Sequence, residues 1–148
     1  MHFTLIWIFK LTATLCAGLF TGAAIYITLV EHPARMKCGT DLAAMEFAAG
    51  YRRASVLQAF LAFTGFVSAM AAGGLSYTKG WYWGAAFLGS VIPYTLLAVF
   101  PTNHHLVDPT LKKDSPLART LLKRWGRLHL LRSLLGLTSF VIFLRLLV

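Results

Sequence analysis

Four long apolar stretches divide the chain, and each is long enough to cross a membrane as a helix. They cover about residues 3–30, 54–75, 81–100 and 128–148. A helix needs roughly 20 mainly apolar residues to cross the hydrocarbon core of a bilayer. The short connection at residues 76–80 makes the second and third spans an antiparallel hairpin. The pattern therefore predicts an all-α, integral membrane, antiparallel four-helix bundle that forms a single domain over residues 1–148.

Two polar segments join the spans at the other end of this bundle. In the first, residues 40–47 predict a short interfacial helix with Thr40 or Asp41 as its N-cap. In the second, Ser115 is expected to cap a helix whose first residue is Pro116. That helix is basic and amphipathic, and we expect it to continue into the fourth span as one long helix.

Glycines and a proline mark special positions within the spans. Gly18 and Gly22 form a small-xxx-small motif, which permits close approach of helices within the bundle or between subunits of a homo-oligomer. Gly73 and Gly74 are expected to end the second span, and Pro93 to kink the third.

The composition supports a membrane protein and changes how its net positive charge is interpreted. Of 148 residues, 57% are hydrophobic and only 13% are charged, and the mean hydropathy is +0.67. A soluble domain of this size cannot bury that much apolar surface. The net charge of +9 therefore favours contact with anionic lipid headgroups rather than with nucleic acid. The expected partners are the bilayer and a lipophilic small molecule, with a homo-oligomer or a larger membrane complex left open.

The basic residues are distributed asymmetrically and predict the orientation of the protein. Ten of the fourteen lie in or beside the two long loops, whereas Lys10, Lys79 and Arg145 lie toward the opposite side. By the positive-inside rule, both long loops are cytoplasmic and both termini face away. The ten are Arg35, Lys37, Arg52, Arg53, Lys112, Lys113, Arg119, Lys123, Arg124 and Arg127.

The topology brings polar residues from all four spans to the loop end. Trp125, His129 and Arg132 are spaced i, i+4, i+7 and so share one helix face. The first three spans contribute a further set that is expected at the same depth: Glu31, His32, Gln58, Asn103, His104 and His105. We predict a polar pocket there.

Each of these residues also has a structural interpretation. Arg132 can extend to lipid headgroups instead of pairing inside the bundle, where Glu31 is its expected partner. Trp125 can be an interfacial anchor, and Asn103 can cap or bridge the loop. Because His104 and His105 are adjacent, at most one of them is expected to face the pocket.

A metal at the histidines His32, His104 and His129 is considered but not favoured. Imidazole suits zinc, copper and iron, yet no two histidines have the i, i+4 spacing of a helical metal motif. A metal-free site can still work, because histidine moves protons near neutral pH while arginine and asparagine stabilise an oxyanion. We therefore expect no cofactor.

Three motifs resemble the anthrone oxygenase-like family, a group of small four-helix membrane proteins that mostly lack a known function. They are Glu31-x-Pro33 after the first span, Pro101-x-Asn103-x-x-Leu106 after the third, and Trp125-x-x-x-His129-x-x-Arg132 at the fourth. The resemblance covers nearly the whole chain, and the last two motifs are its most specific parts.

The resemblance implies an oxidoreductase that acts on a small, lipophilic, enolisable or aromatic substrate. Members with an assigned activity oxidise anthrones to anthraquinones with molecular oxygen. His129 would then accept the proton, and Asn103 and Arg132 would bind the enolate oxygen. Trp125, Glu31, His32, His104 and Gln58 would contact the substrate. The alternative is a non-enzymatic membrane protein, either an accessory subunit of a complex or a carrier of a lipophilic molecule.

Overall fold

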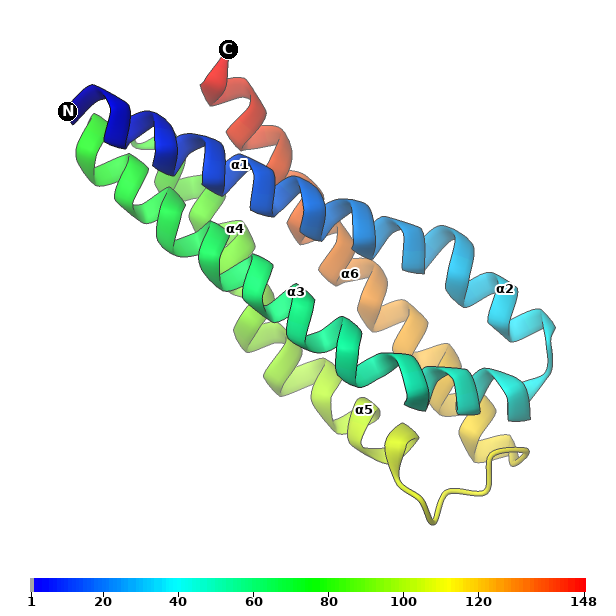
Figure 1. Cartoon of the computed structure of the whole chain (residues 1–148). Coiled ribbons are helices and arrows are strands. Elements are labelled where there is room, and N and C mark those ends of the chain that lie inside the picture. Colours follow the sequence, from blue (N-terminus) through cyan, green and yellow to red (C-terminus); the bar gives the residue numbers. More distant parts are fainter. Residues whose placement is uncertain (1) are drawn as a thin grey trace.

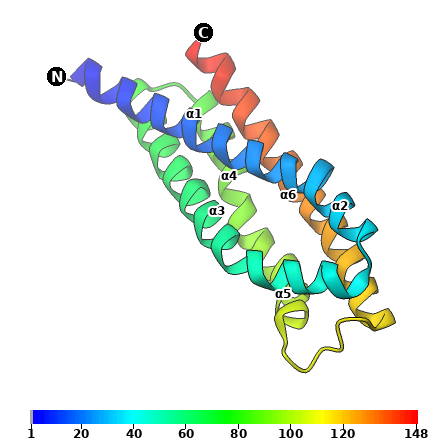
Figure 2. The same cartoon turned by 45° about the vertical axis from the view of Figure 1, so that its right-hand side comes forward.

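In the computed structural model, which describes residues 2–148, four long helical rods lie side by side (Figure 1). Each is long and apolar enough to cross a membrane. The protein is therefore a multi-pass integral membrane protein built as an all-α four-helix bundle. Both termini lie at one end, and the two longer connections lie at the other, here called the loop end (Figures 1 and 2).

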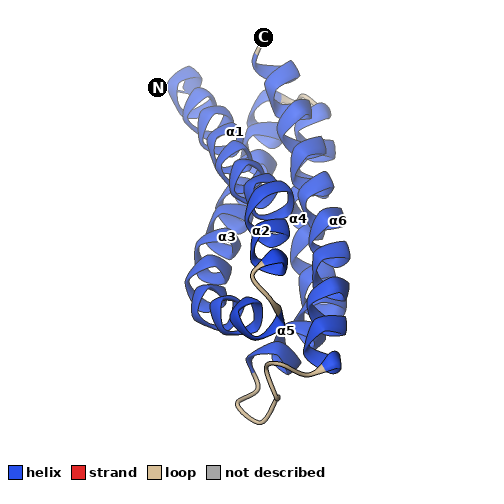
Figure 3. Cartoon of the chain, turned by 90° about the vertical axis from the view of Figure 1, so that its right-hand side faces the viewer, coloured by secondary structure: helices blue, strands red, loops and turns tan. Residues whose placement is uncertain are grey.

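The first three rods extend further toward the loop end than the apolar pattern predicts. The first consists of α1 (His2–Tyr26), a π-helical turn η1 (Ile27–Glu31) and α2 (His32–Lys37); the second is α3 (Thr40–Ser76). The third consists of α4 (Gly80–Tyr94), a second π-helical turn η2 (Thr95–Val99) and α5 (Phe100–Val107); the fourth is α6 (Pro116–Leu147). Within residues 2–148 no strand is present (Figure 3).

The residues expected to form a separate interfacial helix belong to α3 instead. The 37 residues of α3 correspond to about 55 Å of helix, so α3 reaches well beyond the hydrocarbon core. Its N-cap is Gly39, with φ of 95°, and the expected side-chain caps Thr40 and Asp41 lie inside the first turn. Glycine is favoured there because it adopts a positive φ without strain.

The glycine pair Gly73-Gly74 does not end the second span. The helix continues to Ser76 and ends at Tyr77, which adopts a left-handed conformation. A Cβ atom at Gly73 would lie 2.9 Å from Tyr82 Cζ, so this glycine allows α3 to pack closely against α4.

Both prolines near the loop end follow a π-helical turn by two residues. The amide of His32 donates to the carbonyl of Ile27 and precedes Pro33; the amide of Phe100 donates to the carbonyl of Thr95 and precedes Pro101. A proline ring clashes with the carbonyl four residues earlier in a regular α-helix. The wider turn accommodates each proline inside a continuous rod. In the third span, Pro93 lies within α4, two residues before η2 begins.

The fourth rod agrees with the sequence-based prediction. Ser115 accepts a hydrogen bond from the amide of Ala118, with 3.1 Å between Oγ and N, and Pro116 is the first helical residue. From there α6 continues without interruption through the basic amphipathic segment and the fourth span.

Two apolar clusters hold the bundle together, and the side chains of His129 and Arg132 lie between them. The cluster toward the termini includes Trp81, whose ring stacks on Phe143 at 5.2 Å between centroids. The cluster at the loop end is built around Phe47, Leu122 and Trp125. Small residues allow the helices to approach, as at Gly18, which packs against Phe140 inside the bundle, whereas Gly22 faces outward.

Candidate functional site

A cavity of about 310 Å³ lies among η1, α2, α3, α5 and α6 toward the loop end. Six of the eight residues predicted for the site line it: Glu31, Gln58, Asn103, Trp125, His129 and Arg132. Four of these, Gln58, Asn103, His129 and Arg132, are buried polar side chains. Because burying polar groups is costly unless they are paired, their convergence on one cavity marks a candidate ligand site.

His32 and His104 do not line this cavity. His32 packs behind Trp125, with 5.2 Å between ring centroids, and its Nδ1 is buried without a hydrogen-bond partner among the described residues. His104 is exposed and stacks on Phe100, and His105 is exposed as well. Both histidines of this doublet point outward because they lie on the side of α5 opposite to Thr102, Asn103 and Leu106, which are buried.

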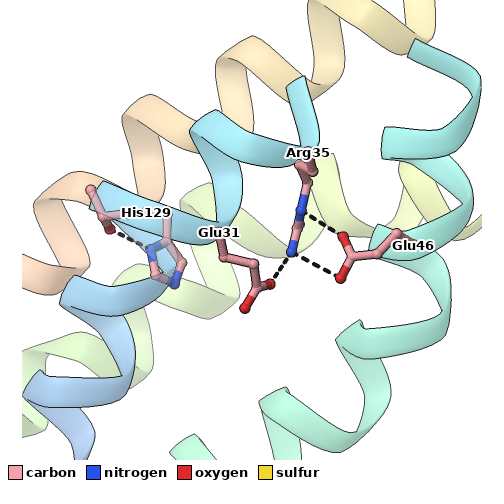
Figure 4. Close-up of polar contacts among 5 residues, drawn as sticks. Glu31, Arg35, Glu46 and His129 are labelled. Carbon is pink, nitrogen blue, oxygen red and sulfur yellow. Dashed lines mark hydrogen bonds and ion pairs between the residues drawn. The ribbon is translucent and has the colours of Figure 1, made fainter. Parts of the chain in front are cut away.

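His129 is held on both sides by its neighbours. Its side chain is 2% exposed, its ring stacks on Trp125 with 4.6 Å between centroids, and its Nδ1 lies 3.0 Å from Thr28 Oγ1. The other ring nitrogen, Nε2, points away from this contact (Figure 4). The first and fourth spans therefore fix both the position and the rotation of the imidazole.

Thr28 belongs to a hydroxyl network that favours one tautomer of His129. Its Oγ1 lies 2.9 Å from the carbonyl of Ala24 and 2.8 Å from Ser133 Oγ. If the Thr28 hydroxyl donates to Ala24, or to Ser133, only an N–H group on Nδ1 can complete the remaining contact. Nδ1 is the acceptor only if Thr28 gives up its bond to Ala24. The network favours the Nδ1–H form, in which Nε2 carries the free lone pair.

Arg132 lies at the cavity without the carboxylate partner that the sequence suggested. Its side chain is 9% exposed, and its Nε is buried with no hydrogen-bond partner among residues 2–148. Its guanidinium carbon lies 5.2 Å above the Phe20 ring, which gives a cation–π contact. The expectation that Arg132 pairs with Glu31 is wrong, because Glu31 is bound to another arginine.

That arginine is Arg35, which connects two spans at the edge of the cavity. It forms ion pairs with Glu31, one turn earlier, and with Glu46 of α3, at 2.6 Å between Nε and Oε2 (Figure 4). The guanidinium also lies 5.8 Å from the Trp125 ring centroid. The sequence interpretation counted Arg35 only as a loop charge, although its i, i+4 spacing from Glu31 is a signal for a helical ion pair.

Asn103 presents a second unpaired polar group. Its side chain is buried, and its Oδ1 has no hydrogen-bond partner within the described part of the chain. An amide carries both donor and acceptor groups, so it can meet either an oxyanion or a hydroxyl of a ligand. With the Arg132 guanidinium, the cavity offers two groups whose hydrogen-bonding capacity is unused by the protein.

No group of three or more His, Cys, Asp or Glu side chains is arranged to hold a metal ion among residues 2–148. Of the three histidines considered as metal ligands, only His129 borders the cavity.

A comparison with known protein families matches a part of the chain that contains most of this site. The profile described as anthrone oxygenase matches residues 47–142, which include Gln58, Asn103, His129 and Arg132. Glu31 and Arg35 precede the matched segment. No curated protein and no solved structure matches the chain.

Proposed function

The chain belongs to the anthrone oxygenase family, and from this membership we propose that it is a membrane oxidoreductase that oxidises a small, lipophilic, enolisable substrate. The observation that carries the proposal is that the buried side chains of His129 and Arg132 line the same cavity. His129 supplies a basic nitrogen and Arg132 an unpaired cation. Removal of a proton from the carbon beside a carbonyl group requires both groups. A base accepts the proton, and a positive group stabilises the negative charge on the oxygen.

In the proposed first step, His129 Nε2 removes a proton from the carbon that will be oxidised. The hydroxyl network favours the Nδ1–H form, in which the accepting lone pair is on Nε2. Stacking on Trp125 limits rotation of the ring. A base fixed in one tautomer and one orientation is already positioned for transfer, which lowers the barrier.

The negative charge that develops on the substrate oxygen is stabilised by Arg132, with Asn103 as a second polar contact. Arg132 needs no rearrangement to serve this role, because its Nε has no partner to release. Gln58, Glu31 and Trp125 complete the wall that faces the substrate. Electrostatic groups that are aimed in advance at a developing charge contribute strongly to catalysis.

Molecular oxygen is the proposed oxidant. The enolate passes one electron to oxygen, and the resulting radicals combine at carbon to give a peroxide. Loss of water then leaves a carbonyl group, so one CH2 group and one O2 become one C=O group and one water. We propose that this sequence uses no cofactor.

The test is conversion of an anthrone to its anthraquinone by the purified protein under oxygen. His129→Gln is expected to lower kcat by about 10²- to 10⁴-fold, the usual contribution of a positioned general base. His104→Gln is the matched control, because this histidine is exposed outside the cavity, and it should retain full activity. Equal losses in the two variants would contradict the proposed role of His129.

A lipophilic carrier is the second candidate, and the same cavity favours it over a purely structural subunit. If the protein binds an anthrone and shields it without converting it, the carrier function is correct and the oxidase function is wrong.

We also propose that the loop end faces the cytoplasm. The support is the concentration of ten of the fourteen basic residues there.

A further inference from the structure

A second hollow lies on the outside of the bundle, between the first rod and the start of α3. It has a volume of about 580 Å³ and is lined mainly by apolar or small side chains. Several of these are exposed on the outside of the bundle, including Tyr26, Val30, Leu42 and Met45. We refer to it as the outer hollow. Its lining suits a neutral, apolar ligand that is dissolved in the bilayer.

The outer hollow and the inner cavity share one wall. Glu31, Arg35 and Glu46 line both spaces. Within this wall, Glu31 and Arg35 belong to the same rod, so only the ion pair between Arg35 and Glu46 crosses from the first rod to α3. Figure 4 shows Arg35 reaching across to Glu46 while also holding Glu31.

The crossing ion pair is suited to open and reclose. The Glu46 side chain is 50% accessible, whereas that of Arg35 is 8% accessible. Because the Glu46 carboxylate is half exposed, it loses less solvation in the pair than a buried carboxylate would, and its release costs correspondingly less free energy. Arg35 keeps Glu31 as a partner when Glu46 leaves, so it is not left as a buried, unpaired charge.

We propose that the outer hollow is a binding site for a neutral aromatic molecule dissolved in the membrane, and that this molecule reaches the inner cavity past the Arg35–Glu46 pair. This inference rests on the proposed function only for the lipophilic character of the substrate. It adds a route: the ligand arrives laterally from the bilayer between the first rod and α3, and not from the aqueous loop end.

The test needs no turnover, so its failure is distinguishable from failure of the proposed oxidation. The protein in phosphatidylcholine vesicles is irradiated with a phenyl diazirine that partitions into the bilayer, and the adducts are mapped by mass spectrometry. Adducts are expected on Met45 in the outer hollow and on Gln58 or Tyr51 in the inner cavity. A sulfonated, water-soluble diazirine should leave the inner cavity unlabelled.

Met45→Trp fills the outer hollow and should abolish the inner adducts. Leu131→Trp is the matched control on the outward-facing side of α6, since Leu131 is 45% exposed and Met45 46%. Its inner adducts should persist. Ala34→Trp fills the same hollow from α2 and replaces the first variant if that one does not fold. Glu46→Gln weakens the crossing ion pair and should increase the inner adducts at a fixed irradiation time.

Four results would overturn the proposal. Inner adducts that survive Met45→Trp would exclude the outer hollow as the route. Inner adducts that form only with the sulfonated reagent would place the route at the aqueous loop end. Adducts confined to the outer hollow would indicate a closed groove that holds an acyl chain or another protein, and unchanged labelling in Glu46→Gln would exclude the ion pair as the point of passage.

Discussion

Thr28 on the first span lies 3.0 Å from the Nδ1 atom of His129 on the fourth, so Nδ1 is the imidazole nitrogen that the first span contacts. Thr28→Val removes the hydroxyl but keeps the shape of the side chain. Loss of one hydrogen bond, about 1 kcal/mol, should lower kcat about fivefold or more. Thr28→Ser should restore activity.

The readout is the pH dependence of kcat for anthrone oxidation together with thermal unfolding. A purely structural role would lower the unfolding temperature of the valine variant and leave its pH profile unchanged. A role in holding the tautomer should change the profile, because the Nε2–H form becomes populated. The charged and titratable groups near His129 are Glu31, Arg35, Arg132 and His32, and all remain in these variants.

Arg132 is expected to lower the folding stability of the protein and to support its activity. A buried guanidinium without a carboxylate partner has a large desolvation cost, and replacing such charges by apolar groups is often neutral or stabilising. Arg132→Met is therefore expected to keep or raise the unfolding temperature while kcat falls by about 10²- to 10³-fold. Arg145→Met at the opposite end should change neither quantity. A strong loss of stability in Arg132→Met would indicate that the guanidinium has a structural partner.

Gly126 is expected to tolerate no side chain. A Cβ atom there would lie 2.5 Å from His32 Nε2 and push this ring against Trp125. Gly126→Ala should therefore destabilise the protein by about 1–3 kcal/mol and lower kcat, because Trp125 supports His129. Gly22→Ala, with nothing within 4 Å of the added atom, should stabilise by up to about 1 kcal/mol. Thermal unfolding in detergent measures both.

Cys38 provides a test of the proposed orientation. It is exposed at the loop end, whereas Cys16 is buried. In intact cells a membrane-impermeant maleimide should not label Cys38 until the membrane is permeabilised. Lys79→Cys, in the connection at the opposite end, should be labelled without permeabilisation when Cys38 is replaced by serine. The reverse pattern would invert the topology.

Metal analysis of the purified protein tests the proposal that the reaction needs no cofactor. We expect less than stoichiometric iron, copper and zinc, and unchanged anthrone oxidation after treatment with a chelator. Activity that is lost with the chelator and restored by one metal would require a metal-dependent mechanism instead.

The sequence predicts the bundle well because lipid imposes a simple rule on apolar length. It also predicts the Ser115 cap and the continuous fourth helix, since a serine before a proline is a strong local signal for a helix start. The convergence of Gln58, Asn103, His129 and Arg132 follows from antiparallel topology alone.

The pairing of charges was harder to predict. The apolar pattern ends the first span at about residue 30 and so places Arg35 in a polar loop, yet the rod continues to Lys37. That continuation places Arg35 one turn beyond Glu31 and within reach of Glu46, so Arg132 loses its expected partner. The choice between two arginines for one glutamate depends on side-chain geometry, which spacing along a chain does not specify.

The π-helical turns determine which side chains of the first and third rods point into the cavity. Each turn adds one residue to a helix, and one residue corresponds to a rotation of about 100° around the helix axis. Deleting a single residue within η1 would turn Glu31 and Arg35 away from α3 while α1 stayed seated in the apolar cluster. The orientation of α2 about the helix axis is therefore independent of the orientation of α1. An insertion or deletion within η1 can rotate Glu31 and Arg35 without changing how α1 packs.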